Sequence, residues 1–349
     1  MSMVFVARAS SPGVQGLDLA TACQRCGLDA GATPPVLGAS LRRAGFDAAV
    51  VFGAGHGLSW LDTPHARGWM RGGVAAEVFA EAWERLRAAG WVDADAALLA
   101  GDELPLLSWD EEPPADPERM SGEEPIGVYA IVDNVPFLRA VLAAGIRTVQ
   151  LRIKQPRDAD TAWHRALRES LRDGLAAARG EGATLWINDH WRVAAELGAD
   201  AVHLGQEDLL HLGTAGRAEL RASGLRLGVS SHAAWELCRA RALAPAYIAC
   251  GPVWPTTTKD MPWRPQGLDN LAWWCRVAGT SVVAIGGVLQ ADQVRLAAQA
   301  GADGVCVLRG LGEDPGRVVP QLQAAFAEGR AARTPGHLPR PHPTLERAA

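Results

Sequence analysis

Two aspartates and two long cations occupy positions from which they can bind a phosphorylated ligand. Asp189 and Asp208 each follow a short apolar run, and Arg152 and Lys154 follow another. Mg²⁺ is typically held by one or two carboxylates, with waters and substrate phosphate completing its octahedron. Cations that point into a small barrel need anions to pair with. The pattern therefore allows Asp189 and Asp208 to share one Mg²⁺ ion beside an anionic substrate.

The stretch GPVWPTTTK and the pair Gly286-Gly287 supply further anion-binding groups. Thr256, Thr257 and Thr258 offer hydroxyls, and Lys259 offers an ammonium group. A glycine such as Gly287 lets backbone N–H groups approach a phosphate closely. A Gly-Gly pair alone is weak evidence, and the Thr/Lys stretch expected opposite it strengthens the prediction.

Each of these residues also has a structural alternative. Alternation along a strand places Gln150 on the same face as Arg152 and Lys154, where the cations can instead pair with carboxylates inside the protein. Asp189, Asp208 and Ser230 each precede a predicted helix and can cap its first N–H groups. Taken alone, either aspartate is more often a cap than a metal ligand.

A repeated strand–helix pattern must position these residues. From Gly127 to about residue 329, short β-branched runs alternate with helical stretches, and the small-residue turns AAGIRTV, LGADAV and AGADGV recur. Eight such units predict a (β/α)₈ TIM barrel over residues 126–332, with the active site at the carboxyl ends of its strands. An open doubly wound sheet is the alternative, but the chain has no dinucleotide fingerprint. The predicted strands begin at Val128, Thr148, Thr184, Ala201, Leu225, Ala246, Ser281 and Gly304.

The remaining segments differ in composition. Residues 1–104 predict a small α/β unit, with strands in VFVARAS and AAVVFGAG and a helix ending at Gly90. Residues 105–125 are acidic and proline-rich, as in a linker, and residues 333–349 predict a disordered tail.

Charge and hydropathy exclude several function classes. The net charge of −5 gives no general attraction to nucleic acid or anionic lipid, and no apolar run approaches the ~20 residues that span a bilayer. We therefore expect a cytoplasmic protein that binds neither nucleic acid nor membrane. Six scattered cysteines do not form a disulfide framework in a chain of 349 residues. Cys23 and Cys26 have CxxC spacing, and two ordinary thiols on a helix are a simpler interpretation than a metal or redox site.

Between Gly127 and Leu311 the chain resembles thiamine phosphate synthases. The matching stretches are QLRIK, IND, HLGQED, LGVSSH, GPVWPTTTK, AIGG and AGADGV, in the order and spacing of that family. The resemblance implies condensation of a pyrimidine diphosphate with a thiazole phosphate to thiamine phosphate, with Mg²⁺ as cofactor and a homodimer left open.

The resemblance also implies roles for individual residues. Asp189 and Asp208 match the metal ligands, and Arg152, Lys154, Lys259 and Ser230 match catalytic positions. The matching substrate-binding positions are Gln150, Arg152, Lys154, Asn188, Ser230, Thr256, Thr257, Thr258, Lys259, Gly287, Leu308 and Arg309.

Arg309 departs from the family, which usually has a serine near the thiazole phosphate at this position. The guanidinium can add a bidentate phosphate contact, or it can crowd the pocket. Two other functions stay open: a thiazole tautomerase, which shares this barrel and uses a histidine near His232, and a catalytically silent barrel that binds thiamine phosphates and regulates a partner.

The N-terminal segment WLDTPHARGW is faintly similar to hydroxymethylpyrimidine phosphate kinases. That family continues with a Gly-Thr-Gly-Cys phosphate loop, whereas this chain continues Met70-Arg71-Gly72-Gly73. Residues 1–104 are therefore interpreted as a degenerate remnant of that kinase family, and His56 and His65 as structural histidines.

Replacing Lys259 by alanine tests the predicted anion site. Loss of one preorganised charge costs ~3–4 kcal/mol in the transition state, so turnover should fall ~10²–10³-fold while the barrel stays folded. Steady-state turnover and circular dichroism measure the two effects. Near-normal turnover would remove Lys259 from the mechanism.

Overall fold

The computed structural model describes residues 3–11, 13–53, 57–115, 126–257, 262–333 and 341–345. These residues form two compact units. The barrel unit contains the described parts of 126–232 and 245–341. The N-terminal unit contains the described parts of 3–115 together with 233–244 and 342–345.

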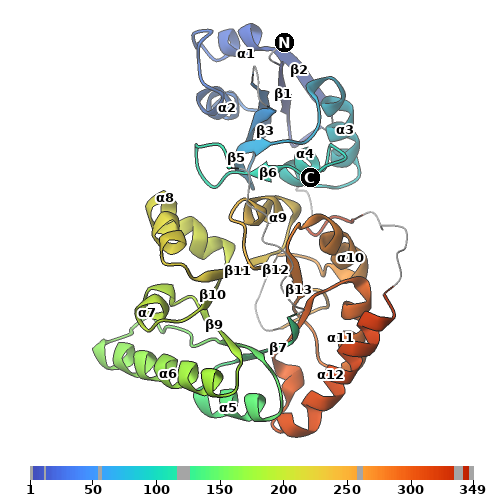
Figure 1. Ribbon diagram of the computed structural model, residues 1–349. Coiled ribbons are helices and arrows are strands. Elements are labelled where there is room, and N and C mark those ends of the chain that lie inside the picture. The colour runs from blue at the N-terminus through green and yellow to red at the C-terminus, as the bar shows by residue number, and fades with distance from the viewer. Residues whose placement is uncertain are drawn as a thin grey trace. The chain divides into compact units, whose positions relative to one another are not determined.

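Eight parallel strands close into a barrel, which confirms the predicted fold class (Figure 1). The strands follow the order β10-β11-β12-β13-β14-β7-β8-β9, and Gly304 pairs with Gly127 where the last strand meets the first. All eight predicted strand runs form strands. They are β7 (Gly127–Val132), β8 (Thr148–Leu151), β9 (Thr184–Asn188), β10 (Ala201–Leu204), β11 (Arg226–Ser231), β12 (Tyr247–Cys250), β13 (Ser281–Ala284) and β14 (Gly304–Val307).

Helices follow the strands of the barrel unit. The longest, α6, begins after Asp160, whose carboxylate accepts a hydrogen bond from the Trp163 N–H, and it buries Leu167, Leu171 and Leu175 at four-residue spacing. The helices of this unit are α5 (Val135–Ala143), α6 (Thr161–Gly180), α7 (Trp191–Glu196), α8 (Gln206–Ala222), α10 (Gly267–Val277), α11 (Ala291–Ala300), the 3₁₀ turn η1 (Arg309–Leu311) and α12 (Pro315–Ala331).

A six-stranded antiparallel sheet forms the centre of the N-terminal unit, in the order β2-β1-β3-β4-β5-β6. The two predicted strands and the predicted helix in residues 1–104 are present as β1, β3 and α3. The elements are β1 (Met3–Ala7), β2 (Val14–Asp18), α1 (Leu19–Arg25), α2 (Pro34–Arg43), β3 (Ala48–Phe52), β4 (Leu58–Asp62), β5 (Arg67–Arg71), α3 (Ala76–Ala88), α4 (Asp93–Leu98) and β6 (Leu106–Leu107).

Helices cover both faces of this sheet. Alternation sends Val4 and Val6 of β1 into a cluster with Leu37 and Leu41 of α2. Phe5 points to the opposite face, where its ring lies 5.4 Å from that of Phe79 in α3. Each face of the sheet therefore offers apolar side chains against which the helices on that side pack.

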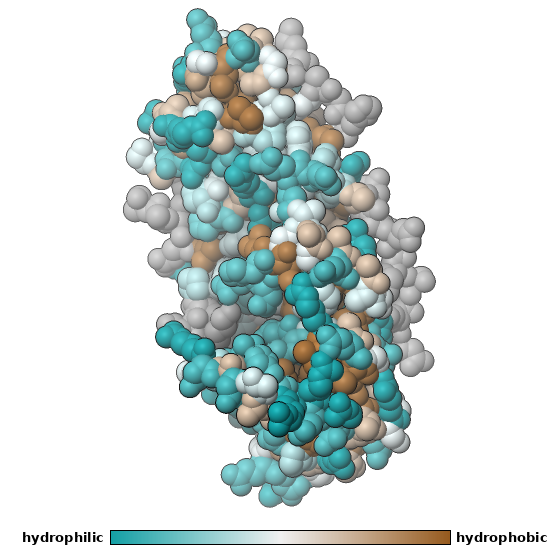
Figure 2. All heavy atoms as spheres, turned by 90° about the vertical axis from the view of Figure 1, so that its left-hand side faces the viewer, coloured by the Kyte–Doolittle hydropathy of each residue, from teal (hydrophilic) through white to brown (hydrophobic). Residues whose placement is uncertain are grey.

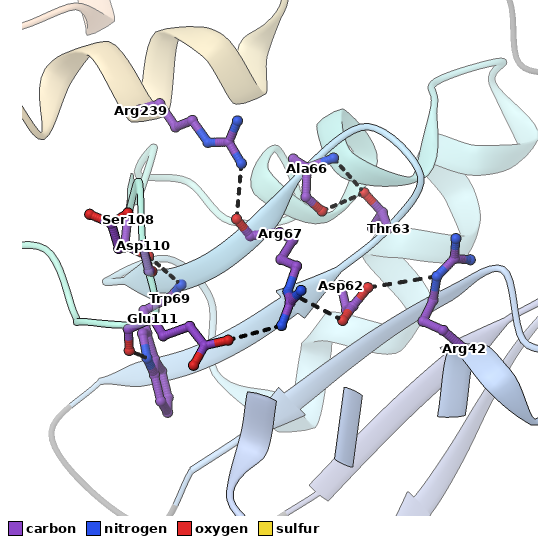
Figure 3. A network of polar contacts seen from close by, with 10 residues as sticks. All are labelled: Arg42, Asp62, Thr63, Ala66, Arg67, Trp69, Ser108, Asp110, Glu111 and Arg239. Carbon is purple, nitrogen blue, oxygen red and sulfur yellow. Dashed lines mark hydrogen bonds and ion pairs between the residues drawn. The ribbon is translucent and has the colours of Figure 1, made fainter. Parts of the chain in front are cut away.

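The segment WLDTPHARGW forms the β4–β5 hairpin and its turn (Figure 3). Thr63 closes the turn by exchanging hydrogen bonds with Ala66. Asp62 lies between the guanidinium groups of Arg42 and Arg67, at 3.6 and 3.9 Å. Burial raises the pKa of Asp62, and the two arginines oppose that shift. In the described chain this segment is a structural hairpin, and His56 lies outside the described residues.

Helix α9 (Ala234–Arg241) belongs to the N-terminal unit although it follows β11 in the chain. Ala233 at its N-cap has no side chain that can cap the helix, and Asp95 of α4 replaces it by accepting from the Trp235 N–H at 2.8 Å. Arg239 donates to the Arg67 carbonyl at 2.9 Å (Figure 3). The N-terminal unit therefore contains a helix that the chain supplies between two barrel strands.

The observed units differ in extent from the predicted domains. Strand β6 lies within the predicted linker 105–125, where Leu107 is fully buried and pairs with Met70 of β5. Thr344 is buried within the predicted tail 333–349. Part of each segment is therefore packed into the N-terminal unit, which its composition does not indicate.

The face drawn in Figure 2 is mostly polar. On the face drawn in Figure 2, apolar residues form separate patches among hydrophilic ones. Large apolar side chains that are exposed include Val36, Val78, Leu210 and Leu289. Among the described helices, none combines the length and apolar character that a membrane crossing requires.

The burial of Asp95 gives the N-terminal unit a specific pH dependence. Burial raises the pKa of Asp95 from 3.8 to about 7. Between those values the folded protein holds a proton that the unfolded chain lacks, so the free energy of unfolding should fall as pH rises from about 4 to 7 and then level off. The slope approaches ~1.4 kcal/mol per pH unit.

Asp95→Asn should remove this dependence while its amide oxygen still accepts from Trp235. Hydrogen-exchange protection of the α9 amides between pH 5 and 8, corrected for intrinsic exchange, measures the effect in both proteins. The same slope in wild type and variant would contradict the assignment to Asp95.

Candidate active site

Most of the predicted site residues lie at the carboxyl ends of the barrel strands or in the loops that follow them. Closure of the barrel brings together ends that are far apart in the sequence: β8 with Gln150, β9 with Asn188, and β11 with Ser230. Loops after β12, β13 and β14 carry the predicted phosphate-binding residues. Thr258 and Lys259 lie outside the described residues.

Asp189 and Asp208 influence one another electrostatically. Asp189 is exposed to solvent, yet the surrounding protein raises its pKa, and the negative charge of Asp208 raises it further. Electrostatic interactions with His190 and Arg152 and a hydrogen bond from Asn188 oppose this shift. The two carboxylates are thus close enough to repel, as two ligands of one cation would be before it binds.

The capping alternative applies to Asp208. Its Oδ2 accepts from the Gly205 N–H at 2.9 Å, at the first turn of α8. Asp208 still has a second carboxylate oxygen, and Mg²⁺ can accept a single oxygen from a carboxylate. Asp189 is different: the N-cap of α7 is His190, and Asp189 makes no capping bond.

The backbone holds Asp189 in the left-handed region, with φ of +64°. Aspartate and asparagine tolerate this conformation better than most residues other than glycine. Its N–H donates to the His203 carbonyl at 3.1 Å, which ties the end of β9 to β10. This main-chain hydrogen bond therefore fixes the backbone position of Asp189 and, with it, the position of its carboxylate at the mouth of the barrel.

Among the predicted cations that the structure describes, Arg152 interacts electrostatically with two polar groups of the barrel. It lowers the pKa of both Asp189 and His203, and its backbone N–H donates to the Val132 carbonyl at 2.8 Å. Lys154 is exposed two residues further along. Neither side chain forms an ion pair with a carboxylate among the described residues.

Inside the barrel, buried polar side chains form a continuous hydrogen-bonded chain. Gln150 Nε2 donates to the Tyr129 hydroxyl at 3.0 Å, and that hydroxyl lies 2.8 Å from the Tyr247 hydroxyl. His203 then bonds Tyr247 through Nδ1 at 2.7 Å and Ser230 through Nε2 at 2.8 Å. Ser230 is therefore part of this chain and does not cap α9.

Burial lowers the pKa of His203 to about 3, with Arg152 and His232 adding to the shift. Its ring stacks on Tyr247, with centroids 5.6 Å apart and an interplanar angle of 16°. His203 is consequently neutral at physiological pH, with one ring nitrogen protonated.

Gly286 and Gly287 have a packing role that the sequence did not reveal. Both have positive φ, of +92° and +73°. A Cβ on Gly287 would lie 2.6 Å from the Trp254 Cβ, and the Gly286 carbonyl accepts from the Trp254 N–H at 3.1 Å. The glycines thus let the loop after β12 pack directly on the end of β13.

Arg309 reaches that same loop from the end of β14. Its Nη1 donates to the Thr257 hydroxyl at 2.9 Å, and both residues are exposed. The preceding Leu308 is partly buried against the barrel core. The residue that departs from the family pattern is thereby placed beside the predicted phosphate-binding loop.

The barrel matches a known family in sequence as well as in geometry. A family model described as thiamine monophosphate synthase matches residues 128–311. This is the barrel with the two aspartates at its mouth. The chain belongs to the thiamine monophosphate synthase family.

Individual relatives agree with this family. A thiamine-phosphate synthase of Rhizobium etli is 42% identical over 188 residues, which are 54% of this chain and 87% of that protein. One of Neisseria meningitidis serogroup A is 41% identical over 208 residues, 58% of this chain and 96% of that protein. The solved thiamine phosphate pyrophosphorylase from Pyrococcus furiosus is 28% identical, with a TM-score of 0.51 over 59% of this chain and 98% of that one.

The sequence did not indicate three of the side chains in the hydrogen-bonded series inside the barrel: Tyr129, Tyr247 and His203. Each lies within a strand, where an aromatic or imidazole side chain is indistinguishable from ordinary core. The only available signal was a histidine inside an otherwise apolar strand run, AVHLG.

Comparing Gly287→Ala with Gly279→Ala separates close packing from backbone strain. Gly279 also has positive φ, of +72°, but a Cβ added there would have no other atom within 4 Å. Both substitutions should cost ~1–2 kcal/mol for the left-handed backbone. Gly287→Ala should cost ~1–3 kcal/mol more, because Trp254 and Pro255 must move. Urea unfolding of the full-length protein measures the loss in free energy of unfolding for each variant. Equal losses would show that the loop after β12 can move away without cost.

Proposed function

We propose that the chain condenses 4-amino-2-methyl-5-(diphosphooxymethyl)pyrimidine with 4-methyl-5-(2-phosphooxyethyl)thiazole, giving thiamine phosphate and diphosphate. The observation that carries this proposal is the proximity of Asp189 and Asp208 at the barrel mouth, with Arg152 beside them. Membership of the thiamine monophosphate synthase family supports it. A cytoplasmic location and a homodimer stay predictions from the sequence.

The donor set at the mouth fits a magnesium ion. In the described part of the chain, no three histidine, cysteine, aspartate or glutamate side chains gather as a metal site. Two carboxylates suffice for Mg²⁺, because waters and substrate oxygens provide its other ligands. Asp189 and the uncapped oxygen of Asp208 would hold the ion, which would neutralise charge on the departing diphosphate.

The proposed reaction breaks the bond between the pyrimidine's exocyclic methylene carbon and the diphosphate oxygen. The electron pair leaves with diphosphate, and the lone pair of the thiazole nitrogen forms the new carbon–nitrogen bond. Such a path needs alignment and charge neutralisation more than acid–base catalysis. Arg152, Lys154 and Lys259 are assigned to the diphosphate.

The other residues are assigned to substrate positioning. Gln150, Asn188 and Ser230 are assigned to the pyrimidine, because they lie at the ends of β8, β9 and β11, close to the ends of β9 and β10 that the two aspartates follow. The thiazole phosphate is assigned to the loops after β12, β13 and β14, where the positioning residues are Thr256, Thr257, Thr258, Gly287, Leu308 and Arg309.

Diphosphate release on mixing both substrates with Mg²⁺ tests the function. Full-length protein should release diphosphate and form thiamine phosphate in equal amounts, and chelation by EDTA should stop both. A tautomerase would convert a thiazole without releasing diphosphate, and a silent regulatory barrel would bind ligands without turnover. Either result would overturn the proposal.

Asp189→Asn tests the metal assignment. Asparagine tolerates the left-handed backbone, so the fold should persist, but one ligand charge is lost. We expect at least a tenfold rise in the Mg²⁺ concentration giving half-maximal rate, about 1.4 kcal/mol in binding. Asp173→Asn, at an exposed position in α6, makes the same charge change away from the site and should leave this value unaltered. An unchanged magnesium requirement in Asp189→Asn would reject Asp189 as a ligand.

A further inference from the structure

The hydrogen-bonded chain inside the barrel has a direction. It runs from Gln150 through Tyr129, Tyr247 and His203 to Ser230. The first four side chains are 6% exposed or less, whereas Ser230 is partly exposed. The end of the hydrogen-bonded chain that reaches solvent is therefore Ser230.

Gln150 begins the chain as a donor, because its Nε2 lies against the Tyr129 hydroxyl and an amide nitrogen only donates. The Tyr129 oxygen accepts this bond, and its own hydrogen can then go to Tyr247 at 2.8 Å. If Tyr247 donated to Tyr129 instead, the Tyr129 hydrogen would be left buried without an acceptor. An unpaired buried donor costs ~1–3 kcal/mol, which favours donation from Tyr129 to Tyr247.

The same assignment of donors and acceptors determines the tautomer of the His203 imidazole. Tyr247 has already accepted from Tyr129, so its hydrogen goes to His203 Nδ1 at 2.7 Å. A buried neutral imidazole that accepts at Nδ1 carries its proton on Nε2. That proton is donated to Ser230 Oγ at 2.8 Å. The Ser230 hydrogen is then free to point away from the chain.

We propose that His203 is a positioning residue that fixes the Ser230 hydroxyl as a hydrogen-bond donor to the substrate. The substrate must accordingly present an acceptor to Ser230, such as a pyrimidine ring nitrogen, and not an amino group. This deepens the function proposed above and rests on it only for the identity of the ligand. The direction of the chain is a property of the protein without substrate.

The tautomer of His203 tests the direction without any substrate. In full-length protein labelled with ¹⁵N-histidine, protonated and unprotonated ring nitrogens have well separated chemical shifts, and His203→Gln identifies the signal of this residue. We expect Nε2 protonated and Nδ1 unprotonated. A proton on Nδ1, or on both nitrogens, would overturn the proposal even if the protein makes thiamine phosphate.

The two tyrosines provide matched variants. Tyr129→Phe leaves Tyr247 able to donate to His203, so His203 should stay protonated at Nε2 in this variant. Tyr247→Phe removes that donor, so His203 should no longer be held in the tautomer that is protonated at Nε2. Both changes delete one hydroxyl from a fully buried ring, so a merely structural role predicts equal effects. Equal effects on the tautomer would count against the proposed direction.

Kinetics test whether the effect acts through Ser230. Tyr247→Phe should lower kcat/KM for the pyrimidine diphosphate about 3- to 10-fold, as expected for one oriented hydrogen bond. In a Ser230→Ala background the same change should cause no further loss, because residues acting as a unit are not additive. Additive losses would contradict the positioning role. If the protein makes no thiamine phosphate, the proposed function is wrong. The tautomer of His203 then remains the only test of the proposed direction of the hydrogen bonds.

Discussion

Polar side chains that point into a closed eight-stranded barrel are cut off from water, and each of their hydrogens needs a protein acceptor. Inside this barrel, five side chains from Gln150 to Ser230 are linked end to end by hydrogen bonds. Because both tyrosine rings are packed in the core, the positions of the hydroxyl groups depend on the same apolar contacts that stabilise the barrel. Stability of the fold and the orientation of Ser230 are therefore properties of one arrangement.

The mouth of the barrel is shaped by backbone conformations that few residues adopt. Asp189 has a left-handed backbone and presents its carboxylate from the end of β9. Gly287 has a positive φ and no side chain, which allows the loop after β12 to pack against it. Arg309 then contacts that loop from the end of β14 through Thr257. Local backbone geometry thus helps to position the groups at the mouth of the barrel.

Sequence patterns predicted the barrel well because each of its strands is a short apolar run followed by a turn of small residues. The polar residues at the strand ends were equally visible, since Asp189 and Ser230 interrupt apolar runs. Spacing could not show that Asp208 also caps α8. Nor could it show that Tyr129 and Tyr247 meet, because they are 118 residues apart and lie in strands that are not neighbours. Such contacts depend on closure of the barrel.

Composition was less informative about where one unit ends and the other begins. Helix α9 follows a barrel strand and looks like its regular partner, yet its N-terminus is capped by Asp95 and its Arg239 binds the β5 backbone. As a result the polypeptide passes between the two units four times, at about residues 118, 232, 244 and 341. A single proteolytic nick in any of the first three crossings would yield two fragments that each contribute to the same folded unit, so they should stay associated under native conditions. Such a protein would separate into its pieces only on denaturation, and its apparent mass in solution would conceal the cut.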